Sequence, residues 1–143
     1  MKEQIKAALA NLEPQLKRVS KLIHDAENDA IYSSEEPEEL YLRNMFYRVG
    51  EDLDKARRYI RQVSARISSE GTISKLSDGR YGNERVYYTS GSSIEFLYSD
   101  PDGDDRWIYS SVEHNGVDYY IVVKPELSLN GLRVRVKDLP FWD

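Results

Sequence analysis

Cysteine is absent from the sequence, and this absence excludes several kinds of site at once. Without cysteine the chain forms no disulfide bond, offers no thiolate nucleophile and holds no cysteine-ligated zinc or iron–sulfur centre. Histidine is almost as scarce, because His24 and His114 are the only two in 143 residues. No pair of histidines stands at the spacing of a metal motif. We therefore expect neither a metal nor a cofactor, and the composition fits a cytoplasmic protein.

Long apolar segments are also absent. The longest apolar run covers residues 119–123, and residues 1–19 contain no apolar segment of the kind that a signal peptide carries. A helix that spans a membrane needs about 20 apolar residues in a row. We therefore expect no signal peptide and no association with a membrane.

Positive charge is in short supply, above all in the second half of the chain. The net charge is −5, and residues 71–143 hold 8 basic against 12 acidic side chains, whereas residues 1–70 hold 12 against 13. Proteins that bind nucleic acid usually present a basic face to the phosphates. We therefore expect no nucleic-acid partner. A lesser alternative is an acidic surface that imitates DNA and occupies a nuclease or a repressor.

Apolar residues in the first half recur with the seven-residue period of packed helices. Two series show the alternating spacing of four and three residues that is typical of a coiled-coil seam. The first series runs from Ile5 to Ala30, and the second runs from Leu42 to Ile67. The sequence therefore predicts a long antiparallel helical hairpin.

Proline and capping residues mark where these helices are expected to begin or break. Ser33 and Glu36 have the spacing of a capping box, and Pro37 suits the first turn of the second helix. Pro14 opposes the pattern, because proline costs an interior helix about 3 kcal/mol. We expect a kink near Pro14 or a restart of the helix with Asn11 as its cap.

The apolar seams are larger than a two-helix hairpin buries by itself. We expect the hairpin either to pack on the second half of the chain or to associate with another copy in a four-helix arrangement. Packing or homo-oligomerisation is therefore the expected role of residues 1–70.

Beyond residue 71 the pattern changes to short alternating runs that are separated by turn residues. Such runs are typical of a small antiparallel sheet or barrel. The clearest turn is Asn115-Gly116, a pair that favours a two-residue type I′ hairpin. In that hairpin Val112 faces Tyr119. We therefore predict an α+β fold, with the helical hairpin over residues 1–70 and a small antiparallel β-barrel or sheet over residues 71–143.

Aromatic and basic side chains gather on the nominally outward face of the predicted sheet. Strand alternation places Trp107, Tyr109 and Tyr120 on this face, and in the last strand Arg133 and Arg135 point outward. Either the helical hairpin packs on this face, or the rings stack a nucleotide-like molecule whose phosphates the arginines hold. These five residues are the candidate ligand-binding site.

An acidic segment, SDPDGDDR at residues 99–106, separates two predicted strands. Its aspartates are Asp100, Asp102, Asp104 and Asp105. The glycine stands at the wrong position for a calcium EF-hand loop. Proline, aspartate and glycine in this order instead predict a β-turn, in which Asp102 caps its own backbone and Gly103 takes a positive φ. We expect a solvated acidic tip that faces a partner protein in a complex.

Three stretches of the second half resemble a known family. They read GRYGNERVYYTSGSSIEFLY from Gly79, RWIYSSVEHNGVDYYIV from Arg106 and LNGLRVRV from Leu129. This pattern is similar to that of uncharacterised small SH3-like β-barrel domains of Firmicutes and of their phages and other mobile elements. The resemblance covers residues 75–137 and implies a fold and a bacterial or phage source, with a cytoplasmic location in the bacterial host. It implies no activity.

Catalytic motifs are missing from the sequence. There is no phosphate-binding glycine loop and no HExxH motif. Strand alternation places Glu113 and His114 on opposite faces, which removes the orienting bond of a Ser/His/Glu relay. We therefore expect a non-enzymatic binding protein of a phage or mobile element that engages a host protein, such as a defence protein, and inhibits or regulates it. The alternative is a protein that sequesters a nucleotide-like small molecule.

Overall fold

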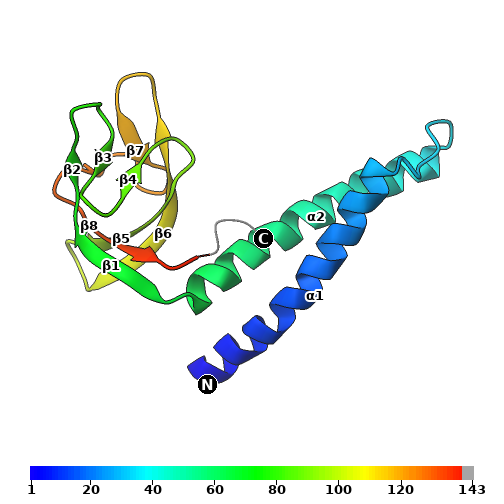
Figure 1. Ribbon diagram of the computed structural model, residues 1–143, viewed down its shortest axis with the longest axis horizontal. Coiled ribbons are helices and arrows are strands. Elements are labelled where there is room, and N and C mark those ends of the chain that lie inside the picture. The colour runs from blue at the N-terminus through cyan, green and yellow to red at the C-terminus, as the bar shows by residue number, and fades with distance from the viewer. Residues whose placement is uncertain (140–143) are drawn as a thin grey trace. The chain divides into compact units, whose positions relative to one another are not determined.

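A computed structural model describes residues 1–139, and the chain divides into two compact units, Met1–Ala65 and Arg66–Asp143. The first unit is a hairpin of α1 (Lys2–Asn28) and α2 (Pro37–Ser64), and the second consists of antiparallel strands (Figure 1). The predicted α+β fold class is therefore confirmed. Neither helix is both long and apolar enough to cross a membrane, within the residues that the structure describes.

Both helices form where the apolar period predicts them, with local differences at the prolines. The helix α1 continues through Pro14, so the expected restart with Asn11 as cap does not occur. Apolar residues on both sides of Pro14 favour a continuous helix, because tertiary packing supplies most helical stability in proteins. Pro37 does open α2, as predicted, but Glu36 is the N-cap and makes no side-chain capping bond. The predicted capping box is therefore wrong, and Ser33 Oγ accepts a weak bond of 3.4 Å from the Glu35 amide instead.

The two helices of the hairpin come close together at Gly50. A Cβ atom added to this glycine would lie 3.4 Å from Cγ2 of Ile23 on α1. Along one side of the hairpin, polar groups bridge the helices. The bridges are Ser20 Oγ to Asp54 Oδ1 at 2.6 Å, Arg57 Nε to Glu13 Oε1 at 3.0 Å, and the ion pair of Arg43 with Glu27.

The C-terminal unit contains two antiparallel sheets (Figure 1). In spatial order the larger sheet consists of β1 (Ile67–Thr72), β8 (Arg133–Lys137), β5 (Ser93–Ser99), β6 (Asp105–His114) and β7 (Tyr119–Ile121). The smaller sheet consists of β2 (Ser74–Lys75), β3 (Tyr81–Gly82) and β4 (Tyr87–Tyr88). Across residues 66–139 the strands take the sheet form of the predicted fold, and no closed barrel is found among them.

Apolar side chains from both sheets and from the connecting loops form one core in this unit. Burying each such side chain contributes roughly 1.5 to 3 kcal/mol to folding. The members that expose less than 2% of their surface are Phe96, Ile73, Ile94, Ile121, Val112 and Val134, together with Leu129. Because β5, β6, β7 and β8 each contribute residues to this core, their packing determines which face of the larger sheet is buried and which face is outward.

The hairpin between β6 and β7 has a different register from the predicted one. Val112 pairs with Ile121 and not with Tyr119. The loop is longer because the side-chain Oδ1 of Asn115 accepts bonds from the amides of Val117 and Asp118, both at 2.9 Å. The register moves by two residues, and a shift of two keeps every side chain on its predicted face.

Candidate functional site

Cross-strand pairing aligns charged and aromatic residues on the outward face of the larger sheet. Glu70 on β1 pairs with Arg135 on β8, Arg135 pairs with Glu95 on β5, and Glu95 pairs with Tyr109 on β6. Directly paired residues share a face, so these four side chains form one row across four strands. This row contains two of the five predicted ligand-binding residues.

Arg135 is held within the row by an internal ion pair. Its Nε lies 2.6 Å from Oε1 of Glu95, whose side chain is only 7% exposed. The guanidinium of Arg135 also lies 4.6 Å from the centre of the Trp107 ring, and Lys137 Nζ lies 3.7 Å from Glu95 Oε1. Trp107 and Arg135 therefore lie together, but the charge of Arg135 is already matched by a buried carboxylate.

The other three predicted ligand-binding residues, Arg133, Tyr109 and Tyr120, make other contacts within the sheet. Arg133 donates from Nε to Oε1 of Glu70 at 3.0 Å, and the hydroxyl of Tyr109 lies 3.1 Å from Ser93 Oγ. Tyr120 stands opposite Glu113, which is six residues along β6 from Trp107 and thus about 20 Å away. One small molecule does not stack on Trp107 and Tyr120 together.

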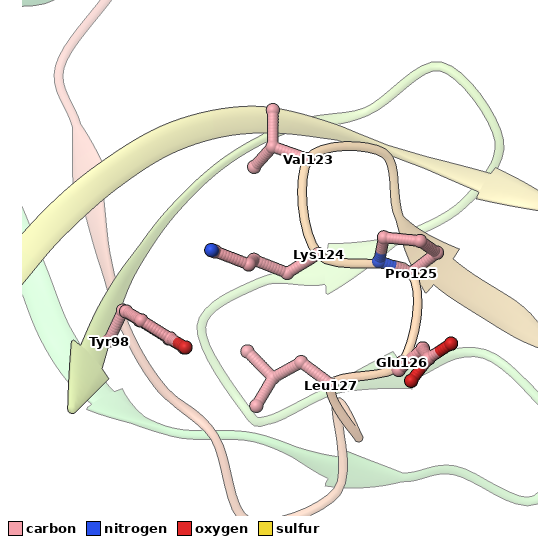
Figure 2. Close-up of a pocket in the computed structure, with 6 residues that line it drawn as sticks. All are labelled: Tyr98, Val123, Lys124, Pro125, Glu126 and Leu127. Carbon is pink, nitrogen blue, oxygen red and sulfur yellow. The ribbon is translucent and has the colours of Figure 1, made fainter. Parts of the chain in front are cut away.

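A separate hollow opens beside the end of β5, as Figure 2 shows. Its volume is about 470 Å³, and it is lined by Tyr98 and by the five-residue loop 123–127 that follows β7. The lining residues are Tyr98, Val123, Lys124, Pro125, Glu126 and Leu127. We call it the Tyr98 hollow. Tyr98 and Leu127 both belong to the apolar packing around the core, so the hollow has a firm floor.

Two cations lie against the ring of Tyr98. Lys124 Nζ is 4.6 Å from the ring centre, and the guanidinium of Arg106, which pairs with Tyr98 across β5 and β6, is 5.8 Å from it. Both distances are within the range of cation–π attraction, which holds the two side chains beside the ring. Figure 2 shows the hydroxyl end of Tyr98 directed toward the hollow, with Lys124 on one side of it.

The acidic turn, residues 100–105, begins directly after β5 and joins it to β6 as predicted. The capping carboxylate belongs to Asp100, whose Oδ1 accepts the Asp102 amide at 3.0 Å, and Gly103 has no positive φ. These two details of the predicted turn are wrong, because Asp100 closes the turn without left-handed backbone. Asp100 lies two residues beyond Tyr98 and so within about 7 Å along the strand.

The four aspartates of the acidic turn have no ion-pair partner among residues 1–139. Asp100, Asp102, Asp104 and Asp105 are all at least partly exposed, and no lysine or arginine of the described chain lies within ion-pair distance of them. With Glu126 they outnumber the two cations beside Tyr98. The Tyr98 hollow therefore has an apolar floor, and the chain segments next to it carry more negative than positive charge.

Burial and local hydrogen bonds shift three titratable groups in the C-terminal unit. Burial in the core, with a smaller effect from the charge of Glu95, raises the pKa of Tyr88 to about 12. Burial also raises the pKa of Tyr81, whose hydroxyl donates to Asp118 at 3.0 Å. The Tyr119 amide lowers the pKa of Asp118. The Tyr81–Asp118 bond ties the smaller sheet to the 115–118 loop, and none of these three groups lines the Tyr98 hollow.

Candidate catalytic and metal-binding groups remain scattered. His114 uses Nδ1 to accept the Gly116 amide at 3.0 Å and places its ring 4.6 Å from that of Tyr119, so it stabilises the loop. Over the described part of the chain, no three His, Cys, Asp or Glu side chains gather closely enough to hold a metal ion. The acidic turn is included in this statement.

A second hollow of about 590 Å³ lies along β1, and it differs in chemistry from the Tyr98 hollow. Its lining is polar, formed by residues 68–72 of β1 and residues 83–85 of the loop before β4. The Asn83 side chain donates to the Thr72 carbonyl at 3.3 Å, which partly closes the open edge of β1. The second hollow lacks both an aromatic floor and an uncompensated cluster of charge.

Sequence reasoning identified the acidic turn but missed the Tyr98 hollow. Tyr98 belongs to no recognisable motif, and Lys124 and Leu127 lie in a segment that has none either. The hollow arises because this loop folds back to the end of β5, more than 20 residues away in sequence. The one local signal was Pro125, which marks residues 123–127 as a loop and not a continuing strand.

Comparison with known proteins gives one match. The model of a family described as a domain of unknown function, DUF5348, matches residues 71–136. No curated protein and no solved structure matches the chain. The matched residues include the acidic turn, the Tyr98 hollow and the Glu95–Arg135 pair, and they leave the helical hairpin outside.

Proposed function

We propose that the protein is a non-enzymatic binding protein whose C-terminal unit engages a partner protein at the Tyr98 hollow and the acidic turn. The observation that carries this proposal is the placement of four aspartates, none with an ion-pair partner among residues 1–139, within a few residues in sequence of an open apolar hollow. Protein interfaces commonly combine an apolar centre with a polar rim. The partner segment that fits carries basic side chains next to apolar ones.

Charge favours this partner over an anionic one. Lys124 and Arg106 are attracted to the Tyr98 ring, whereas no lysine or arginine among residues 1–139 lies within ion-pair distance of the aspartates of the acidic turn. A basic segment would satisfy the aspartates, and an apolar side chain of the same segment would contact Leu127 and Val123, which is 50% exposed. Such complementarity increases association rate and specificity more than raw affinity.

The predicted host partner and the SH3-like, phage-borne origin belong to the same proposal as finer expectations. A small acidic protein that docks on a basic surface of a host protein blocks that surface by occupying it. The nucleotide-sequestering alternative has one observation in its favour, the close approach of Arg135 to Trp107. Against it stands Glu95, which already neutralises that arginine.

Calorimetric titration of the full chain tests the proposal. The probe is a soluble peptide that carries arginines next to leucines, and a second peptide with serines in place of the leucines reports the apolar contribution. The triple variant Asp102→Asn, Asp104→Asn, Asp105→Asn is expected to bind the first peptide about tenfold more weakly, since each lost charge pair is worth up to about 1 kcal/mol.

The control for this titration is a variant with the same change of net charge in the hairpin. Glu35→Gln, Glu36→Gln and Glu51→Gln together remove three exposed negative charges from the other unit. This control is expected to bind the peptide as the unmodified protein does. Equal loss of affinity in both triple variants would show non-specific charge attraction and would contradict the proposal.

A further inference from the structure

The two sides of the helical hairpin differ sharply in chemistry. At 100° per residue, all the charged side chains of α1, and His24, fall within about half of the helix circumference. The polar bridges Ser20–Asp54 and Arg57–Glu13 show that this half, on both helices, forms one side of the hairpin. The opposite side, formed by the remaining arcs of α1 and α2, is called here the uncharged side.

Large apolar residues remain exposed on the uncharged side. On α1 these are Ile5 (52% exposed), Leu12 (41%), Val19 (44%) and Leu22 (68%). On α2 they are Val49 (43%) and Val63 (47%), with the rings of Tyr41 (55%) and Tyr59 (47%) at the margin. Within one hairpin, therefore, only half of each predicted apolar seam is covered.

The exposed apolar area is large enough for a stable interface. If a fully exposed large side chain presents about 150 to 250 Å², these eight residues leave roughly 700 Å² of largely apolar surface in water. A standard protein interface buries about 800 Å² on each partner. Patches beyond a few hundred Å² are uncommon on monomeric proteins, so a partner is expected to cover this side.

The charges at the margin identify the partner as a second copy. Beyond the first turn, Arg48 lies at the edge of this side of α2. Two further charged residues share one height along the hairpin, Asp52 within this side of α2 and Arg18 at the edge of the corresponding arc of α1. Neither residue has an ion-pair partner among residues 1–139. Arg18 lies five residues after Glu13, and Asp52 lies five residues before Arg57, so both stand at the same height in the hairpin.

We propose that two copies of the chain associate through their uncharged sides into an antiparallel four-helix bundle, with Arg18 of each copy next to Asp52 of the other. A two-fold axis parallel to the hairpin places α1 of one copy beside α2 of its partner and leaves the position of each residue along the axis unchanged. Arg18 of each copy therefore lies next to Asp52 of the other. The same arrangement buries the second half of each seven-residue seam in the helix packing typical of such bundles.

Charge exchange in the full chain tests this arrangement, with the dimer dissociation constant measured by sedimentation equilibrium. Arg18→Asp and Asp52→Arg are each expected to raise the dissociation constant roughly tenfold, because two symmetric contacts become repulsive. The double variant is expected to restore most of the lost affinity. Arg58→Asp, which makes the same charge change on the opposite side of α2, is the matched control and is expected to change nothing.

A second variant tests the apolar part of the interface. Val19→Asp is expected to abolish the dimer, and its helix content, measured by circular dichroism, shows whether the hairpin still folds. A chain that is monomeric at high micromolar concentration would overturn the proposal, whether the C-terminal unit or another protein covers the uncharged side. So would a double charge-exchange variant that dimerises no better than the single ones. Either failure leaves the peptide titration of the C-terminal unit unaffected.

Discussion

The Nε of Arg135 lies 2.6 Å from Oε1 of Glu95 in the middle of the five-stranded sheet, on the face away from the core. Glu95 would be a solvated residue by strand alternation, yet only 7% of its side chain is exposed. Arg135 and Lys137 lie against its carboxylate. Side chains of the outward face therefore shield one another from water, and their ion pair stabilises the sheet.

Removal of the Glu95 carboxylate is expected to destabilise the C-terminal unit strongly. Glu95→Ala removes the carboxylate that Arg135 and Lys137 share in a largely buried environment. Loss of one partner of a buried ion pair lowers the free energy of unfolding by about 3 to 5 kcal/mol. The matched control is Arg133→Ala, which breaks an exposed pair with Glu70 and is expected to cost less than about 1 kcal/mol. Urea unfolding measures both values, and equal losses would contradict this interpretation.

Nucleotide titration separates the two interpretations of Trp107 and Arg135. Because Glu95 already neutralises Arg135, we expect ATP and cyclic nucleotides to release no heat of binding in calorimetry. Binding that disappears in Arg135→Ala, in a protein that remains folded, would instead support the sequestering alternative.

Alkaline pH is expected to destabilise the C-terminal unit through Tyr88. Its pKa is about 12 in the folded protein and close to 10 in the unfolded chain, so the unfolded state releases its proton first. The contribution of Tyr88 to the free energy of unfolding is therefore fully present below pH 10. It is lost between pH 10 and about 12, which lowers the free energy of unfolding by roughly 2 to 3 kcal/mol.

The variant Tyr88→Phe tests this assignment. It removes the ionisable hydroxyl and is expected to flatten the fall in stability over that pH range, although Tyr81, whose pKa is also raised, retains a smaller effect. Urea midpoints across the alkaline range give the comparison. An unchanged slope in Tyr88→Phe would show that another group causes the loss.

Gly50 is expected to tolerate a methyl group but nothing larger. An alanine Cβ would meet Cγ2 of Ile23 at 3.4 Å, and replacing glycine in a helix interior gains up to about 1 kcal/mol in helix propensity. Gly50→Ala is therefore expected to leave the hairpin equally or more stable. Gly50→Leu is expected to separate the helices and lower the stability by about 1 to 3 kcal/mol. Thermal unfolding followed by circular dichroism distinguishes the two, and a stable leucine variant would contradict the close approach.

The sequence predicted those features that depend on local pattern. The seven-residue period from Ile5 and from Leu42 located both helices, and alternation assigned Trp107 and Tyr109 to the outward face. The acidic segment was recognised as a turn from its proline and glycine. These signals are carried by neighbouring residues, so a single sequence is enough to recognise them.

Features that depend on contacts between distant residues were not predicted. The burial of Glu95 requires Arg135, 40 residues later, to cover it. The register of β6 and β7 depends on the side chain of Asn115, which holds a longer loop than the Asn-Gly pair alone implies. The Tyr98 hollow needs the 123–127 loop to fold back to β5, and no local pattern encodes that approach.

The binding function of the C-terminal unit is tested most directly by nuclear magnetic resonance of the full, ¹⁵N-labelled chain during titration with the arginine–leucine peptide. Backbone amide shifts are expected at residues 98–106 and 123–127, and they are expected to disappear in the triple variant of Asp102, Asp104 and Asp105. Shifts spread evenly over the acidic surfaces of both units, or no shifts at all, would contradict this binding function.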